Sequence, residues 1–192
     1  AIGRRPLFVN TTGARNVAIG TNVLVANTTG QQNVAIGTYS MLNNTIGVSN
    51  IAIGAYAMRD NTTGAINTAI GTLALENNTE GQQNTAIGSS CLAANTTGQL
   101  NTAIGSAALN DNTTGANNTA IGVGSLGSCT TGVSNTAIGY TSGNAITTGI
   151  NNTIIGNEAD GAATVSNQIA IGYSTVVSAQ YGIAIGDNIT AG

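Results

Sequence analysis

The chain repeats one short sequence at a fixed spacing from end to end. An Ile that precedes a Gly recurs at ten positions that are 17 residues apart, from Ile2 to Ile155. Two more follow at Ile171 and Ile185, after steps of 16 and 14 residues. A fixed period of this length means that one structural unit stacks on its copies. We therefore expect a single repeat domain over residues 1–192, with 17-residue rows to about residue 156 and shorter rows over 157–192.

Written as one row, the repeat is N-T-A-I-G-x-x-A-L-x-x-N-T-T-G-x-x, and its positions are called places one to seventeen below. Gly at places five and fifteen argues against helix. The T-A-I segment alternates its side chains as a strand does, and N-T-T-G is typical of a turn, which we expect at the surface. The sequence therefore predicts an all-β fold, a parallel β-roll or β-solenoid with two short strands and two turns per coil. At about 4.8 Å per coil, the rod would be on the order of 55 Å long.

The places of the row predict which side chains are buried. Ile at place four and Leu or Met at place nine should form apolar ladders inside the coil, and Asn at place one should form an amide ladder. Ala at place three faces away from the Ile and stays small, so we expect it to pack against other copies of the chain. On this assignment Ile104→Asp would prevent assembly and Thr113→Ser would be nearly silent. Both Gly places should permit turns with positive φ.

The composition excludes several classes of function. The chain has no His and no Lys, charged residues make up 6%, and the net charge is −3, so we expect neither catalysis nor binding of nucleic acid. No apolar run reaches the length of a membrane-spanning helix, so we expect no membrane insertion. We assign no catalytic, cofactor-binding or metal-binding residue and expect no cofactor. The acids weighed for such roles are Asp60, Glu76, Glu80, Asp111, Glu158, Asp160 and Asp187.

Two pairs of acids are candidates for a site. Asp60 and Asp111 share place eleven but lie three rows apart, about 14 Å by coil spacing, which is too far for a glycosidase pair. Glu158 and Asp160 lie in one irregular row, where Ca²⁺ binding is an alternative to a solvated loop.

Two further residue types carry a weak chemical signal. The Asn-x-Thr triplets, such as Asn61 to Thr63, match the glycosylation acceptor pattern, but the repeat generates them as turns. Cys91 and Cys129 occupy unlike places and predict no metal motif or disulfide. We expect each cysteine to fill a small buried position.

The chain resembles two families of fibrous proteins. The segment QIAIGYSTVVSAQYGIAIGDNITAG, residues 168–192, resembles the 14-residue head repeat of trimeric autotransporter adhesins, the YadA-like heads. The 17-residue rows are similar to the N-T-A-I-G repeats of bacteriophage tail-fibre proteins, many of which end in a self-cleaving chaperone domain. The resemblance implies a left-handed β-roll assembled as an intertwined or tightly packed homotrimer, in a virion tail fibre or at the cell surface.

This resemblance implies a structural or adhesive role in host attachment, with a host glycan or protein as a further partner. The chain begins and ends inside a repeat, so we expect it to be a segment of a longer fibre. Candidate outer-surface residues follow the Ala-Ile-Gly segments: Thr38-Tyr39, Ala55-Tyr56 and Tyr140-Thr141. One alternative is a monomeric β-solenoid that binds ice through the Thr residues of places thirteen and fourteen, although adjacent Thr side chains point to opposite faces. Another is an enzyme domain of a tail spike, which would need paired acids.

Overall fold

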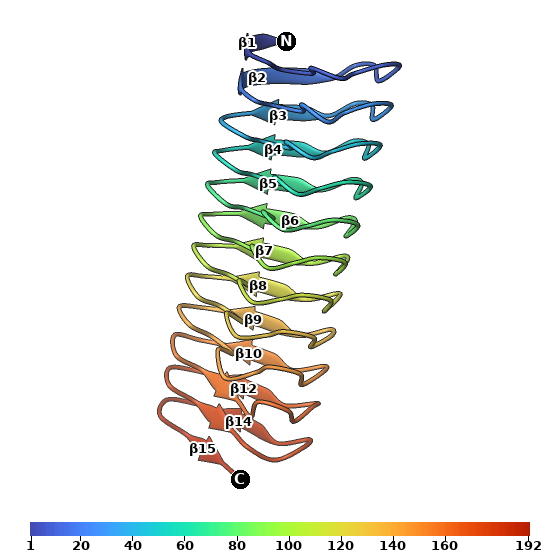
Figure 1. The fold of residues 1–192 in the computed structure, drawn as a ribbon. Coiled ribbons are helices and arrows are strands. Elements are labelled where there is room, and N and C mark those ends of the chain that lie inside the picture. Colours follow the sequence, from blue (N-terminus) through green and yellow to red (C-terminus); the bar gives the residue numbers. More distant parts are fainter.

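The computed structural model describes all residues, 1–192, as an elongated parallel β-solenoid without helices (Figure 1). Twelve strands form one long sheet in sequence order. They are β1 (Ile2–Arg4), β2 (Val17–Thr21), β3 (Val34–Ile36), β4 (Ile51–Ile53), β5 (Thr68–Ile70), β6 (Thr85–Ile87), β7 (Thr102–Ile104), β8 (Thr119–Ile121), β9 (Thr136–Ile138), β10 (Thr153–Ile155), β12 (Ile169–Ile171) and β14 (Ile183–Ile185). The fold class and the stacking of one row per period are therefore as predicted.

The register of the long sheet follows the period of the sequence. Ala103 on β7 pairs with Ala86 on β6 and with Ala120 on β8, so each residue lies beside its copy from the neighbouring row. The same alignment holds across the shortened rows, where Ala170 pairs with Ala184. Residues lost from the shorter rows therefore come from the loops and leave the sheet unbroken.

The expectation of two strands per coil is wrong for the 17-residue rows, which contain one strand each. A second, three-stranded sheet appears in the shortened rows alone, from β11 (Asp160–Gly161), β13 (Val176–Val177) and β15 (Thr190–Ala191). In the longer rows the returning segment turns sharply instead, with positive φ at places seven, nine and seventeen. In the row of β7 these are Ala107, Leu109 and Asn117, with φ of 57°, 51° and 58°. The turn at place nine sets the 17-residue rows apart, because the shortened rows keep positive φ at the equivalents of places seven and seventeen, such as Glu158 and Asn167, but have a strand residue at place nine.

Leu109 shows how such a turn is stabilised. A left-handed conformation costs a non-glycine residue about 1–2 kcal/mol. The Leu109 side chain is fully buried, and burying a Leu contributes about 1.5–3 kcal/mol. Burial therefore offsets the backbone strain, and the predicted ladder of Leu and Met at place nine is confirmed. Its buried members are Leu24, Met41, Met58, Leu75, Leu92, Leu109 and Leu126.

The assignment of the two strand faces is wrong. Ala103 at place three is fully buried, whereas Ile104 at place four remains 37% exposed on the outside of the sheet. The returning segment lies close above the strand, since the Cys91 thiol on it lies 3.1 Å from the Ala103 carbonyl oxygen. Leu109 already fills the narrow space between strand and returning segment, so only a methyl group fits at place three. The Ala ladder is thus part of the core of one chain and is not a surface for other copies.

Two asparagine ladders run along the rod. The predicted one, at place one, is confirmed: the Oδ1 of Asn101 accepts from the backbone N–H of Asn118 at 3.0 Å and from its side-chain amide at 3.2 Å. The second, at place twelve, was expected to form turns at the surface. Its Asn residues are buried, and the Nδ2 of Asn112 donates to the Oδ1 of Asn95 at 2.7 Å. This second ladder ends at Asn112, whose Oδ1 has no partner because Cys129 replaces the next Asn.

The two glycine places serve different purposes. Gly105 at place five has a φ of 134°, as predicted, and it packs against the carbonyl group of Gly122 in the next row. Gly98 at place fifteen does not have positive φ, which corrects the expectation for that place. A Cβ added there would overlap the side-chain oxygen of Asn95 and the carbonyl oxygen of Gly115. Place fifteen therefore needs Gly because the Asn ladder passes so close to it.

Candidate functional site

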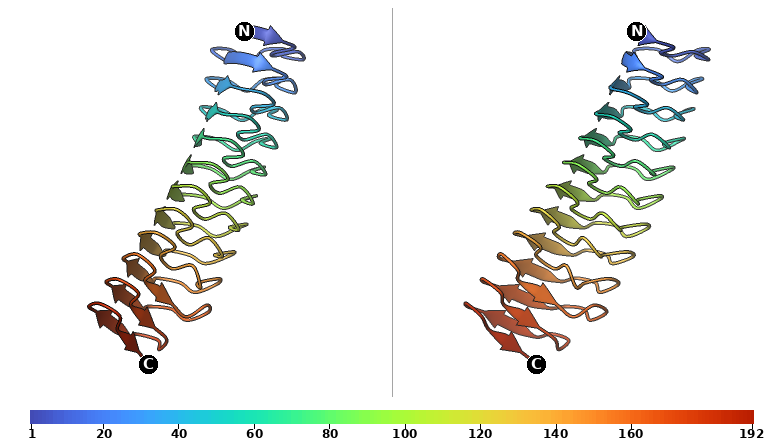
Figure 2. Two further views of the ribbon diagram at one scale, coloured as in Figure 1. Left: turned by 90° about the vertical axis from the view of Figure 1, so that its left-hand side faces the viewer. Right: turned by 60° about the vertical axis from the view of Figure 1, so that its left-hand side comes forward.

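The long sheet presents its outer face to solvent along one side of the rod (Figure 2). Places two and four form this face, as two parallel files of side chains. Ile19, Ile70 and Ile104 at place four are each 37% exposed, and neither place carries a charged residue in any row. We call these two files the sheet face. It is the most continuous apolar surface of the chain.

The composition of the sheet face changes along the rod. At place two, the rows near the N-terminus have Val17, Val34 and Ile51, and the last rows have Ile169 and Ile183. Between them, six successive rows have Thr: Thr68, Thr85, Thr102, Thr119, Thr136 and Thr153. Place four is Ile throughout. The face is therefore fully apolar near both ends and mixed in the middle.

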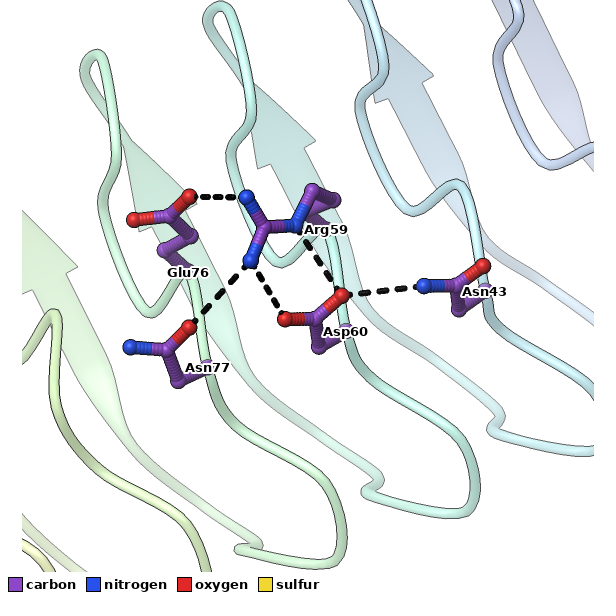
Figure 3. A network of polar contacts seen from close by, with 5 residues as sticks. All are labelled: Asn43, Arg59, Asp60, Glu76 and Asn77. Atoms are coloured by element: carbon purple, nitrogen blue, oxygen red, sulfur yellow. Dashed lines mark hydrogen bonds and ion pairs between the residues drawn. The ribbon is translucent and has the colours of Figure 1, made fainter.

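A second surface feature lies on the segments that return from the strands. Arg59 donates hydrogen bonds to Asp60, with Nη2 2.6 Å from Oδ2, and its Nη1 pairs with Glu76 (Figure 3). Asp60 also accepts from the Nδ2 of Asn43 at 2.9 Å. The hydrogen bond from Arg59 holds the pKa of Asp60 below its ordinary value and raises the pKa of Arg59. Arg59 and Asp60 are therefore both charged at neutral pH. With Asn43 on one side and Glu76 on the other, they connect three successive rows.

An aromatic pair lies in the same part of the rod. The rings of Tyr39 and Tyr56 stack with centroids 5.2 Å apart and an interplanar angle of 25°. Both occupy place seven, in neighbouring rows, with φ of 57° and 60°. The expectation that the segments after Ala-Ile-Gly lie at the outer surface is confirmed, since Tyr56 and Tyr140 are exposed and Tyr39 is half-buried.

The acids weighed from the sequence do not form a common site. Asp60 belongs to the Arg59 network, while Asp111 accepts from its neighbour Asn110, three rows further along the sheet. The Oε2 of Glu158 accepts from the Ser174 hydroxyl at 3.2 Å. No group of three or more His, Cys, Asp or Glu side chains is placed to share a metal ion.

Asp160, whose row was considered for Ca²⁺, has a structural partner instead. Its carboxylate accepts from the backbone N–H groups of Ala145, at 3.0 Å, and Gly161, at 2.8 Å. Burial nevertheless raises its pKa. Asp160 begins β11, so these bonds attach the last 17-residue loop to the first of the shortened rows.

The N-T-T triplets that begin at place twelve, such as Asn61 to Thr63, are blocked as glycosylation sites by the ladder at that place. Asn61 is fully buried, and its Nδ2 donates to the Oδ1 of Asn44 at 2.7 Å and to the carbonyl oxygen of Gly64 at 3.2 Å. A glycan on this nitrogen would require the coil to open. The adjacent Thr62 is also engaged, since its hydroxyl donates to the Thr79 carbonyl oxygen at 3.0 Å. Of the two Thr files, only the one at place fourteen is exposed, as Thr63 is.

Both cysteines are buried and unpaired, as expected. Burial raises the pKa of Cys91 to about 12 and that of Cys129 to about 11, from an ordinary value of 9.0. The reactive thiolate is therefore scarce at neutral pH in the folded chain.

We expect the thiols to react with a disulfide reagent at pH 8 at least roughly a hundredfold more slowly in the folded chain than in denaturant, from the thiolate fractions alone. The measurement is release of the coloured thiolate with and without denaturant. Since folding raises both pKa values, protonated thiols favour the fold at neutral pH, and this contribution is lost as the pH rises above about 9. Immediate reaction of both thiols in the native chain would contradict the buried positions.

No helix of the chain has the length and apolar character that crossing a membrane requires. Comparisons with protein-family models, with curated proteins and with solved structures found no match to this chain.

Proposed function

We propose that the chain is a structural segment of a homotrimeric fibre, which projects or forms the receptor-binding region of a phage tail fibre or cell-surface adhesin. The observation that carries the proposal is the sheet face. Its Ile file remains more than one-third exposed in most rows, whereas the Leu and Met side chains at place nine, from Leu24 to Leu126, are completely buried.

The extent of the sheet face favours a protein partner. Twelve strands at about 4.8 Å give an apolar strip roughly 50 Å long. Single exposed hydrophobic residues are ordinary on soluble proteins, but a contiguous strip of this length marks an interaction surface. The lack of charge at places two and four is also typical of the buried centre of an interface.

The pattern at place two favours other copies of the same chain as that partner. Copies related by a rotation about an axis parallel to the rod have identical rows at the same height, so Val meets Val and Thr meets Thr. Such an arrangement closes on itself and leaves no free sheet face. The Thr hydroxyls of the middle rows then lie near one another, where they are able to exchange hydrogen bonds.

The number three and the placement on a virion or cell surface come from the resemblance to YadA-like heads and tail-fibre repeats. The sequence had placed the contact between copies at the Ala file. Because that file is inside the coil, the proposed contact moves to the sheet face. Three parallel rods around one axis form a stiff shaft and present any binding site three times, which strengthens attachment through multivalency.

The test is an Ile104→Asp/Ile121→Asp variant. Both side chains lie on the outer face, so each single chain should still fold, whereas unpaired charges buried between copies would cost several kcal/mol and abolish assembly. Sedimentation should show the parent at three times 18.9 kDa and the variant at 18.9 kDa, with the β-sheet circular dichroism retained.

Thr114→Asp is the matched control for this experiment. Thr114 is exposed at place fourteen, where another row carries Glu80, so the charge is placed away from the sheet face and the mass should not change. A parent that sediments at 18.9 kDa would overturn the trimer. Thermal hysteresis measured on that monomer would then test the ice-binding alternative.

A further inference from the structure

Three neighbouring rows depart from the repeat in the same region of the rod. The rows of β3, β4 and β5 contain the stacked tyrosines and both salt bridges of the chain. Arg59, Asp60 and Glu76 are also the only charged residues between Arg15 and Glu80. The repeat itself needs none of these side chains, because the same places hold Ala, Ser, Gly or Asn in later rows. Their coincidence in one region points to a role other than stacking the coils.

The aromatic pair and the ionic network are joined through one turn of the chain. Tyr56 and Arg59 are the first and last residues of one turn, closed by the bond from the Arg59 N–H to the Tyr56 carbonyl oxygen at 3.2 Å. Arg59 then reaches along the rod to Glu76 and, at 3.4 Å, to the Oδ1 of Asn77. We define Tyr39, Tyr56, Arg59, Glu76 and Asn77 as the Tyr–Arg surface. None of its residues belongs to a strand, and Figure 3 shows the network on the loops in front of the sheet.

The Tyr–Arg surface retains unused polar groups. In the network, Arg59 engages the Oε1 of Glu76 and the Oδ1 of Asn77. The second carboxylate oxygen of Glu76 and the amide nitrogen of Asn77 take no part in these two bonds and make no other side-chain hydrogen bond. Arg59 thus holds an acceptor and a donor in place, on Glu76, whose side chain is 17% exposed, and on Asn77. Tyr56, on the turn that ends at Arg59, is 36% exposed.

This combination matches the chemistry of a sugar. The C–H face of a pyranose ring packs on an aromatic ring, while its vicinal hydroxyl groups each donate and accept hydrogen bonds. One arginine and the two carboxylates of Asp60 and Glu76 give the region a net charge of −1, which disfavours an anionic sugar. No pocket opens on the chain, so the ligand would lie along an open surface.

We propose that the Tyr–Arg surface binds a neutral saccharide, with a sugar ring on Tyr56 and its hydroxyl groups on Glu76 and Asn77. This proposal names the class of receptor and its place on the chain, and in that respect it rests on the proposed function. It does not depend on assembly, because the surface lies off the sheet face.

The test uses the full chain and an array of neutral oligosaccharides of glucose, galactose, mannose and N-acetylhexosamines, with sialylated counterparts. We expect neutral glycans to bind, and sialylation next to the bound unit to weaken binding. The Kd of the best neutral oligosaccharide is then measured by NMR titration. Tyr39→Asn/Tyr56→Asn should weaken it by roughly tenfold or more through loss of stacking, and Glu76→Gln by roughly tenfold through loss of a charged acceptor.

Asn is chosen because it tolerates positive φ, and Asn22 already occupies place seven with a φ of 52°. The matched control is Tyr140→Asn, which removes an exposed, unpaired tyrosine at place six, where another row carries Asn157. Its Kd should equal that of the parent. The proposal is overturned if the parent binds no neutral glycan, or if the double Tyr variant binds as the parent does. Sedimentation of the same samples reports on assembly separately, so this failure and that of the trimer are distinguishable.

Discussion

The Ala103→Leu variant is expected to lose about 3 kcal/mol or more of its free energy of unfolding. Ala103 is fully buried between the sheet and the returning segment, and Ala86 and Ala120 flank it in the adjacent rows. Overpacking a filled core typically costs 1–3 kcal/mol, and here the strand cannot move away without breaking register with both neighbours. Denaturant unfolding followed by circular dichroism measures the loss.

The matched control is Ile104→Leu, at the next residue of the same strand. Ile104 points outward, and a volume-conserving change there should cost less than about 1 kcal/mol. The opposite ranking, with Ala103→Leu nearly silent and Ile104→Leu strongly destabilising, would show that the strand faces are reversed.

The second large effect is expected for Asn101→Ala, in the ladder at place one. The change removes the acceptor for the Asn118 N–H and the donor, at 2.8 Å, to the Gly115 carbonyl oxygen. Asn101 and Asn118 are both buried, and each buried polar group left without its partner costs about 1–3 kcal/mol. We therefore expect a loss of roughly 3–5 kcal/mol, a large share of the stability of an ordinary domain.

Two other asparagines give a graded comparison, again measured by denaturant unfolding. Asn112→Ala should cost less than Asn101→Ala, because the Oδ1 of Asn112 has no partner to lose and Gly115 still accepts from Asn101. Asn110→Ala should change the free energy of unfolding by less than about 0.5 kcal/mol, because its amide bonds only to Asp111 at the surface. If all three variants lose the same amount, the two ladders do not stabilise the fold in the way described here.

The Tyr–Arg surface shows where sequence reasoning stopped short of a site. Tyr39 and Tyr56 were recognisable as surface residues from their place in the row, and Asp60 and Glu76 were weighed as acids. The sequence does not show that these residues belong together. The turn from Tyr56 to Arg59 in the structure is what joins place seven to places ten and eleven. A search for departures from the repeat at neighbouring rows would have found them, because all lie within the rows of β3 to β5.

The repeat alone sets the period, and with it the parallel sheet, its register, the Leu and Met ladder and the ladder of Asn at place one. Each of these follows from identical residues lying beside one another in successive rows. The alternation of T-A-I also required Ala and Ile to face opposite sides. What alternation leaves undetermined is which side is the interior.

The tertiary structure decided that question through the space between the two segments of each coil. Leu109 and the small residue before it occupy that space from the returning segment, so the facing strand has room for Ala103 and none for Ile104. Because this space is narrow, the returning segment of each 17-residue row passes through residues of positive φ and forms no second strand. The second Asn ladder is likewise buried inside the coil. Hydrophobicity ranks Ile above Ala for burial, but in a coil this thin the available volume outweighs it, which leaves an Ile file on the outside of the rod.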